Sequence, residues 1–515
     1  MTWRERPADV LVVGVGLGAV AAALAAADRG ASVVLAGRER RVGGQLTSQA
    51  VPPDEHPWIE RFGCTARYRA LRDGIRDYYR AHYPLTAAAR ANPRLNPGAA
   101  RVSALAHEPR VAQAVLEAML AAHRSSERIE LLLEHELRGA DVDGHRVTAV
   151  SVGDRVIHPA MVIDATETGD LLPLCGAEHV TGFESREQTG EPHAPARAQP
   201  DNLQPVTACF AVDHLEGEDH AVPRPPGYES LAPHFSLSAP DARTNRPVAR
   251  TIDPNPPGDP AEIGPDLSNP ELDRDLWLFR RIAARGNFTP GAYASDITLV
   301  NWPQVDYLGG NVLGDGAATH EAAARQLSLS FLHWLQTEAG LPGLRLRGDV
   351  VGDSPDGLAE EVYVRESRRI RGETTVVEQD IAHAVRGDHG AVPYPDSVGI
   401  GAYRIDLHPS TGGDPYIDIA CCPFRIPLGA LIPVRLDNLL AGAKNIATTH
   451  ITNGAYRLHP VEFSAGEAAG HVAALCAATG TVPRAVRADP RQLAELQGEL
   501  RRAGVELTWP DVRAY

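Results

Sequence analysis

A glycine-rich segment near the start of the chain has the spacing of a phosphate-binding turn. The segment reads GVGLGA, residues 14–19, and lies between an apolar run and an alanine-rich stretch. Gly14, Gly16 and Gly18 leave room for a tight turn and for a phosphate close to the backbone. Ala19 stands at the third position of the fingerprint, which accepts alanine. The spacing predicts a dinucleotide site, although similar turns also join strands to helices in proteins that bind no nucleotide.

The residue that should hold the ribose is missing from its usual place. In dinucleotide-binding folds the second strand ends in a carboxylate that accepts hydrogen bonds from ribose hydroxyls. Here the expected strand, residues 33–35, runs into Ala36 and Gly37, and the nearest carboxylate is Glu39. Losing the carboxylate would cost about 2–4 kcal/mol of binding free energy. Three outcomes are open: Glu39 reaches back to the ribose, the dinucleotide binds weakly, or the site has been given up.

Two further segments could lie against a bound cofactor. GGQLTSQ, residues 43–49, offers backbone N–H groups and short polar side chains suited to the polyol chain and ring of a flavin, and its candidates are Gly43, Gly44, Gln45 and Thr47. MVIDATETGD, residues 161–170, reads as a buried strand that ends in small residues, so the backbone at Asp164 and Ala165 can pass close to a cofactor. Each segment also has an ordinary structural reading, as a glycine turn or a buried strand.

The elements that must position these residues form a β-α-β unit. A buried strand at 9–13, a helix at 19–29 and the strand at 33–35 predict an open parallel sheet. We expect a further helix at 110–123, a strand at 129–136, a hairpin of 146–152 with 155–157, and a buried strand at 161–165. A helix at 321–339 and late elements at 438–443 and 461–477 complete the pattern.

This order predicts an α/β fold with a Rossmann-like FAD-binding domain that is discontinuous in sequence and an inserted α+β substrate domain. We expect residues 1–174 to form the first part of the FAD-binding domain and 175–392 the substrate domain, with a long proline-rich loop at 222–270. Residues 393–485 would return to the FAD-binding domain, and 486–515 would form a C-terminal extension.

Composition excludes several partners. A net charge of −16 gives no basic surface for nucleic acid or an anionic membrane, so we expect a small-molecule substrate. The six cysteines show no metal-ligand spacing, and we expect buried thiols and no metal site. Residues 10–27 are uncharged, which is compatible with a signal peptide, but the glycine spacing favours the turn and a cytoplasmic protein.

Several long segments together resemble one family. They include EPRVAQAVLEAML, IDATETGDLLPL, GAYRIDLHPSTGGDPYIDI and NIATTHITNGAYRLHPVE, and the resemblance covers nearly the whole chain. The chain resembles the FAD-dependent oxidoreductases of the glutathione-reductase-like flavoprotein superfamily, in the branch with a GGQLTSQ-type segment. The resemblance implies FAD as cofactor, with contacts from the following residues: Gly14, Gly16, Gly43, Gly44, Gln45, Arg110, Asp164, Gly442 and Asn445. Relatives usually carry glutamate at the position of Gly37 and glycine at that of Ala19.

Candidates for substrate chemistry come from polar residues in two regions. RESRRI gathers Arg365, Glu366, Arg368 and Arg369, and if the segment is a strand one of its faces could meet an anionic ligand; a structural ion-pair network explains it equally well. The resemblance places His408, His450, Arg457 and His459 near the flavin, where a histidine can take a proton. His56 is a weaker candidate.

Two functions follow. The first is a flavin-dependent oxidoreductase, an oxidase or dehydrogenase, that removes hydride from a carbon bearing nitrogen or oxygen in a polar or acidic small molecule. The second is a non-redox lyase, cyclase or isomerase on a flavoprotein fold with a degenerate dinucleotide site, which Gly37 motivates.

Overall fold

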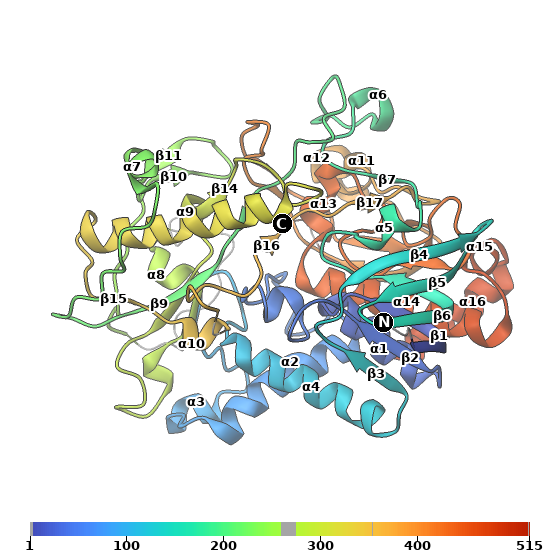
Figure 1. The fold of residues 1–515 in the computed structure, drawn as a ribbon, viewed down its shortest axis with the longest axis horizontal. Helices are drawn as coiled ribbons and strands as arrows, with labels where there is room; N and C mark the ends of the chain where they lie inside the picture. Colours follow the sequence, from blue (N-terminus) through green and yellow to red (C-terminus); the bar gives the residue numbers. More distant parts are fainter. Residues whose placement is uncertain (1–3, 259–273, 353, 513, 515) are drawn as a thin grey trace.

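The apolar runs at the two ends of the chain pair in one sheet. In the computed structural model, which describes residues 4–258, 274–352, 354–512 and 514, this sheet has seven strands in the order β3-β2-β1-β6-β5-β4, and β22 also pairs with β6 (Figure 1). Its strands are β1 Arg4–Val13, β2 Val33–Ala36, β3 Ile129–Leu132, β4 Leu137–Asp143, β5 Arg146–Val152, β6 Arg155–Asp164 and β22 Leu439–Ala441. The predicted parallel sheet, assembled from distant parts of the sequence, is confirmed.

Strand β6 differs from its prediction. The strands expected at 155–157 and 161–165 are one continuous strand, which pairs with β1 in parallel along its length. On its other side β6 pairs first with β5, antiparallel, and then with β22, parallel. The hairpin expected between 146–152 and 155–157 is confirmed, and its second strand is the first part of the longer β6. Strand β3 is shorter than the expected 129–136 and ends at Leu132.

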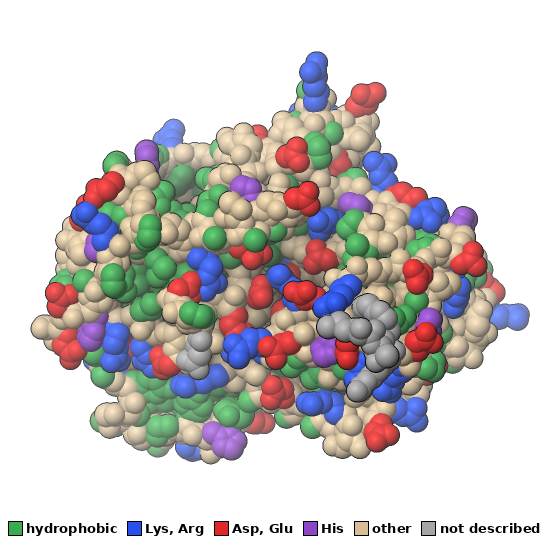
Figure 2. Space-filling model, in the orientation of Figure 1, with side chains coloured by type: hydrophobic (Ala, Val, Ile, Leu, Met, Phe, Trp, Pro, Cys, Tyr) green, Lys and Arg blue, Asp and Glu red, His purple; other side chains and the backbone are tan. Residues whose placement is uncertain are grey.

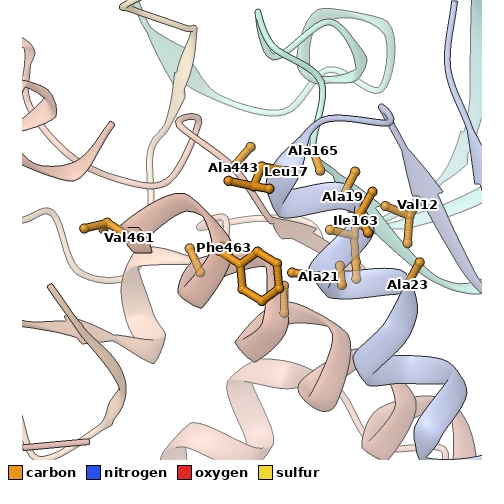
Figure 3. Close-up of a cluster of buried hydrophobic side chains, with 14 of the residues drawn as sticks. Val12, Leu17, Ala19, Ala21, Ala23, Ile163, Ala165, Ala443, Val461 and Phe463 are labelled. Atoms are coloured by element: carbon orange, nitrogen blue, oxygen red, sulfur yellow. The ribbon is translucent and has the colours of Figure 1, made fainter. Parts of the chain in front are cut away.

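Two helices cross closely over this sheet. Helix α1, Leu17–Asp28, is buried at every residue except Asp28, and it packs on α14, His459–Thr479. Small residues make the approach possible, because a Cβ atom on Gly466 or Gly470 would collide with the backbone of α1. Figure 3 shows Phe463 of α14 beside Ala21 of α1. Helices α2, Ala66–His82, and α4, Pro109–Ser125, pack on each other, and α4 also contacts α1 and β3.

The middle of the chain builds a second body of structure with its own apolar core, which includes Trp277, Trp302 and Phe331. A four-stranded antiparallel sheet contains β9 Phe210–His214, β12 Arg281–Ala283, β13 Ile297–Val300 and β15 Leu344–Leu346. A three-stranded sheet contains β8 Val206–Thr207, β14 Asp306–Tyr307 and β16 Tyr363–Val364. The long helix α9, Ala317–Thr337, contacts β8 and β14 and begins four residues before its predicted start. It forms the upper left of Figure 1.

The expected proline-rich loop contains only short elements where it is described. These are α7 Tyr228–Leu231, β10 Ala239–Pro240 and β11 Pro247–Val248, and residues 259–270 lie outside the described residues. Other short pairs are β7 His179–Val180 with β17 Arg369–Ile370, β18 Ser397–Gly401 with β21 Phe424–Pro427, and β19 Ile405–Leu407 with β20 Ile417–Ile419.

The remaining helices connect these parts. They are α3 Ala87–Ala91, α5 Leu171–Leu174, α6 Arg186–Thr189, α8 Leu276–Phe279, α10 Gly348–Val351, α11 Glu378–Ile381, α12 His383–Arg386, α13 His450–Tyr456, α15 Pro483–Ala488 and α16 Pro490–Arg502. All six cysteines are free and buried, as predicted. Among the described helices, none is both long enough and apolar enough to cross a membrane.

Candidate functional site

Four parallel strands end at the same level of the sheet. The register pairs Val13 with Ala36 and with Asp164, and Asp164 with Ala441. The residues that follow these strand ends therefore lie side by side: Gly14, Gly37, Ala165 and Gly442. We call this line of strand ends and the loops that follow them the strand-end edge. In open α/β sheets this edge is where ligands bind.

The glycine turn has the backbone that its sequence predicts. Gly14 has φ +103°, and a Cβ atom there would collide with the backbone of Ala165. Gly16 precedes the first turn of α1, so the N–H groups of that turn face the strand-end edge. A methyl group on Gly18 would collide with the carbonyl oxygen of Gly442. Ala19 is fully buried in the core under the turn, where its methyl group has room.

Glu39 takes the space that Gly37 leaves open. A Cβ atom built on Gly37 would lie 2.6 Å from Glu39 Oε2 and 3.0 Å from the Val15 side chain. Glu39 Oε2 is buried without a hydrogen-bond partner among the described residues, and burial raises the pKa of this carboxyl to about 7. A free carboxylate oxygen thus lies beside the glycine turn, where a ribose would be held. Of the three outcomes that the sequence leaves open, this geometry supports the first.

A cleft opens in front of Glu39. Its volume is about 210 Å³, and its walls include Gln49, Glu167 and Arg368. A wider cleft of about 790 Å³ adjoins it. The two clefts have these lining residues in common: Arg38, Glu39, Glu321 and Glu361. Arginine and carboxylate side chains are interspersed over the face shown in Figure 2.

The GGQLTSQ segment folds back under the glycine turn. Gly43 and Gly44 have φ of +109° and +47°, and a short 3-10 helix, η1 Gly44–Leu46, follows. Gln45 is fully buried, and its Nε2 donates to the carbonyl oxygen of Arg457 at 3.2 Å while its Oε1 has no partner among the described residues. Thr47 donates its hydroxyl to the carbonyl oxygen of Val42 at 2.7 Å, so this hydroxyl holds the segment itself.

Asp164 ends β6 with one oxygen satisfied and one free. Its Oδ1 accepts from the Thr166 N–H at 3.0 Å, whereas Oδ2 has no partner among the described residues, and burial raises the pKa of the carboxyl to about 6. Asn445 Nδ2 donates to the Asp164 carbonyl oxygen at 2.9 Å and Asn445 Oδ1 accepts from the Ala443 N–H at 3.1 Å. Asn445 therefore fixes the loop after β22 against β6.

Arg110 lines a different cleft from the one in front of Glu39. It pairs with Glu108 at 2.6 Å on the first turn of α4 and lines a separate cleft of about 710 Å³ with Tyr83, Tyr293 and Arg347. This cleft has no lining residue in common with the two clefts at Glu39.

Three of the predicted catalytic residues belong to one polar network. Arg457 Nη1 donates to the Tyr363 hydroxyl at 3.2 Å, and its Nη2 lies 3.3 Å from Asp406 Oδ2. His408 Nδ1 lies 2.5 Å from Asp306 Oδ2, and Arg365 Nη2 lies 2.9 Å from Asp306 Oδ1. Burial disfavours the charged form of Asp306, but Arg365 and His408 outweigh it, and the pKa falls to about 2. Asp306 is therefore a carboxylate that holds His408 in place.

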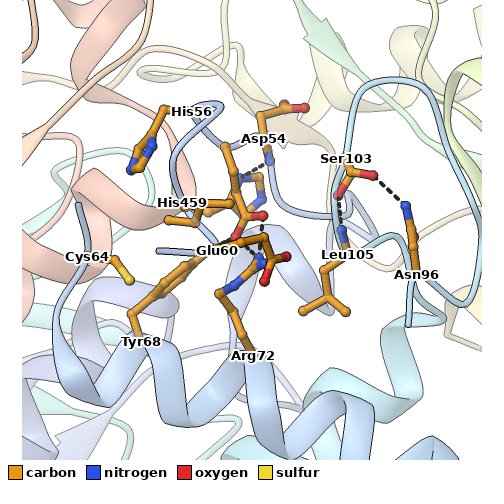
Figure 4. A network of polar contacts seen from close by, with 12 residues as sticks. Asp54, His56, Glu60, Cys64, Tyr68, Arg72, Asn96, Ser103, Leu105 and His459 are labelled. Carbon is orange, nitrogen blue, oxygen red and sulfur yellow. Dashed lines mark hydrogen bonds and ion pairs between the residues drawn. The ribbon is translucent and has the colours of Figure 1, made fainter. Parts of the chain in front are cut away.

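His459 is a buried histidine whose ring contacts the backbone of Asp54. Its Nδ1 accepts from the Asp54 N–H at 3.1 Å, as Figure 4 shows, and burial lowers the pKa of its ring to about 3. The ring is therefore neutral at pH 7, and its proton lies on Nε2. Nε2 is buried, and a hydrogen bond to the Val51 backbone favours the charged ring without outweighing burial.

His56 has a structural position. Its Nε2 lies 2.9 Å from the Gly63 carbonyl oxygen, its ring packs edge-on against Trp509 at 5.2 Å, and burial lowers its pKa to about 4. The histidine therefore joins Trp509 to the segment around Gly63.

His450 and the arginines of RESRRI are buried among charges. His450 Nδ1 lies 2.8 Å from Glu366 Oε2, and the ring stacks on Phe183 at 3.6 Å. Arg369 pairs with Glu366 and, at 3.0 Å, with Glu184. The segment is not a continuous strand, because only Tyr363–Val364 and Arg369–Ile370 are strands. We call Glu184, Glu366, Arg369 and His450 the paired network. Arg368 is apart from it and pairs with Asp170 at 3.0 Å on the wall of the 210 Å³ cleft.

Lys444, Glu167 and Glu462 form a cluster at the glycine turn that the sequence reasoning missed. Lys444 pairs with Glu167, lies 3.7 Å from Glu462, and is buried. A signal was available, because Lys444 is the only lysine among 515 residues.

The residues of the strand-end edge fit FAD. Buried polar atoms normally have hydrogen-bond partners, so several without one beside a glycine turn suit a bound ligand. Among the described residues of the strand-end edge, these atoms are Glu39 Oε2, Gln45 Oε1 and Asp164 Oδ2. Gly16 and Gly44 have no Cβ atom, and the space beside both is occupied by Glu167 Oε1.

Comparisons with known proteins agree with this geometry. The model of the FAD dependent oxidoreductase family matches residues 9–500. No curated protein matches the chain.

Similar solved structures include a thioredoxin reductase from T. acidophilum, 16% identical, which covers 36% of this chain and 42% of its own, with a TM-score of 0.18. An L-amino acid deaminase from Proteus myxofaciens is 14% identical and covers 42% of this chain and 54% of its own, with a TM-score of 0.20. NikD, an amino acid oxidase, is 16% identical and covers 42% of this chain and 60% of its own, with a TM-score of 0.23. The matched part is less than two thirds of each of these structures. The family match across residues 9–500 shows that the chain belongs to the FAD-dependent oxidoreductases, with FAD as its cofactor.

Proposed function

We propose that this oxidoreductase removes hydride from a carbon bearing nitrogen or oxygen in a small polar or acidic molecule, with His408 as the base. Bound FAD supplies the hydride acceptor. As the C–H bond breaks, its electron pair and hydrogen leave together, and the substrate's N–H or O–H proton goes to His408 Nε2. The product is then an imine or a carbonyl compound.

The His408–Asp306 pair carries this proposal. Asp306 is ionised and buried, and it engages His408 Nδ1. His408 Nε2 lies 3.9 Å from Asp406 Oδ2, beyond hydrogen-bond distance, and can accept a proton. The His408 side chain is 16% exposed, whereas those of His450 and His459 are buried. Among the predicted histidines, His408 therefore combines a fixed ring with access to a substrate.

Arg457 supports a polar or acidic substrate. The residue is 3% exposed, and its Nε–H is buried without a partner among the described residues. Asp406 and Tyr363 engage the other nitrogens, so the guanidinium is held with one donor free. A carboxylate or other oxygen of the substrate would satisfy that donor. Arg365 acts through Asp306: it contacts this carboxylate, which in turn positions the base His408.

We propose a role in small-molecule metabolism, because the substrate inferred above is a small polar or acidic molecule. A cytoplasmic location stays a prediction from the sequence. The non-redox alternative was motivated by the missing carboxylate at position 37. Because Glu39 takes the space that Gly37 leaves open, that reason no longer holds.

A substrate screen with matched variants tests the proposal. Amines, amino acids, hydroxy acids and alcohols are mixed without oxygen with the yellow holoenzyme, and loss of flavin absorbance identifies substrates. For any substrate found, we expect His408→Asn to slow this loss about 10²–10⁴-fold at unchanged FAD content. His389→Asn, at an exposed histidine, is the control. Unchanged reduction by His408→Asn would show that another group accepts the proton.

A further inference from the structure

Lys444 is a buried cation in the loop that follows β22. Its side chain is fully buried between Glu167 and Glu462. Burial acts against its charge, but the two carboxylates outweigh burial and raise the pKa of Lys444. A charged ammonium group therefore lies within the strand-end edge, close to the start of α1.

The two carboxylates occupy the surroundings of the glycine turn. Glu462 Oε1 accepts from the Gly18 N–H at 3.1 Å, and Gln45 Nε2 donates to Glu462 Oε2. Glu167 Oε1 would lie 2.7 Å from a Cβ atom on Gly16 and would collide with one on Gly44. The Glu167 carboxylate thus lies between the two glycine segments, and Oε1 is buried without a partner among the described residues.

This arrangement places the Glu167 carboxylate in the space that the diphosphate of a bound dinucleotide would occupy. The N–H groups that begin α1 and the space at Gly16 suit a diphosphate, which carries negative charge. The Glu167 carboxylate and a diphosphate cannot share that space, and their like charges repel strongly where little water is present. One of them must leave when the other is bound.

We propose that Lys444 binds the diphosphate of FAD and that Glu167 is its counter-ion in the cofactor-free chain, which the diphosphate displaces. Lys444 then exchanges a carboxylate oxygen for a phosphate oxygen, and Glu462 stays on the Gly18 N–H. Glu167 moves toward the 210 Å³ cleft, whose wall it already forms. This inference requires the cofactor of the family and is independent of the base in the proposed reaction, so either can fail alone.

Calorimetric titration of the cofactor-free protein with ADP, FAD and riboflavin tests the exchange. We expect Glu167→Gln to bind ADP and FAD about tenfold more tightly, because the competing charge is gone, and Lys444→Met to bind both about tenfold or more weakly. Riboflavin lacks the diphosphate, so its affinity should not change in either variant. Glu495→Gln, at an exposed glutamate of α16, is the control. Weaker ADP binding by Glu167→Gln would overturn the displacement.

A second measurement uses the wild-type chain and needs no variant to fold. Because the sequence has one lysine, protein labelled with ¹³Cε-lysine gives one lysine side-chain signal in an NMR spectrum. We expect ADP and FAD to shift this signal and riboflavin to leave it in place. A signal that ADP does not move would show that Lys444 keeps its carboxylate partners, and would overturn the proposal even if the reaction proposed above is correct.

Discussion

The paired network and the strand-end edge are both buried and polar, but they differ in how their polar groups are satisfied. In the paired network, the Arg369 guanidinium contacts two carboxylates and two backbone carbonyl oxygens, those of Gly182 and Thr448. At the strand-end edge, Glu39, Gln45 and Asp164 each keep an oxygen without a partner among the described residues. Buried polar groups are costly when unpaired. The first region is satisfied by ion pairs within the protein, including the 2.8 Å pair of His450 Nδ1 with Glu366 Oε2, although that nitrogen makes no regular hydrogen bond among the described residues. We infer that the second region is completed by a ligand.

The largest expected effect concerns the paired network. Arg369→Met leaves Glu184 and Glu366 with less compensation for their buried charge, so we expect unfolding free energy to fall by about 3–5 kcal/mol. The affinity of the folded protein for FAD should not change. Denaturant unfolding and FAD titration measure the two quantities, and Arg371→Met, at an exposed neighbour, is the control. If Arg369→Met lost FAD affinity at unchanged stability, the paired network would belong to the cofactor site, and the contrast between the two regions would be wrong.

Folding stability and FAD affinity should respond to pH in opposite directions. Glu191 lies outside the paired network and accepts from the hydroxyl of Thr449, the residue before His450, at 2.6 Å. Burial raises the pKa of Glu39 and of Glu191 to about 7, above their ordinary value of 4.5. A raised carboxyl pKa contributes stability that is present below pH 4.5 and is lost as pH rises through 7. We therefore expect the stability of the cofactor-free protein to fall between pH 5 and 7.5, and Glu191→Gln to flatten this fall.

We expect the pH dependence of FAD affinity to come from the ionisation of Glu39 and not from that of Glu191. An ionised carboxylate accepts ribose hydroxyls better than a protonated one, so FAD affinity should increase as pH rises through 7. Titrations at pH 6 and 8 measure this step in wild type and in Glu191→Gln, where we expect it to persist. If Glu191→Gln removed the step, the assignment of Glu39 to the ribose would be wrong.

Arg368→Lys should have the smallest effect. Arg368 donates to the Thr168 carbonyl oxygen at 2.8 Å and pairs with the half-exposed Asp170 on the wall of the Glu39 cleft. Lysine keeps the charge but loses the planar fork, so we expect FAD affinity to fall about two- to fivefold. Substrate KM should not change. A raised KM at unchanged FAD affinity would instead place Arg368 beside the substrate.

Much of the strand-end edge could be predicted from the sequence, because local patterns determine it. The glycine spacing at Gly14 and Gly16 and the apolar strands before them specify the turn and the parallel sheet. The reach of Glu39 could not be predicted, since it depends on the free space beside Gly37 and Val15 in three dimensions. Likewise, the partners of His408 and His450 come from segments about 100 and 84 residues away, and no local pattern distinguishes the two histidines.

The most direct test of the ribose assignment is the affinity of Glu39→Gln for FAD. Purified cofactor-free wild-type protein and the variant are titrated with FAD at pH 8, and flavin fluorescence reports binding. We expect wild type to bind FAD and the variant to bind it about 10–100-fold more weakly, with thermal stability of the cofactor-free variant equal to or above that of wild type, because a charge-assisted hydrogen bond to the ribose is lost. Equal affinities would show that Glu39 does not hold the ribose, and would contradict the account of how this chain binds its cofactor without a carboxylate at position 37.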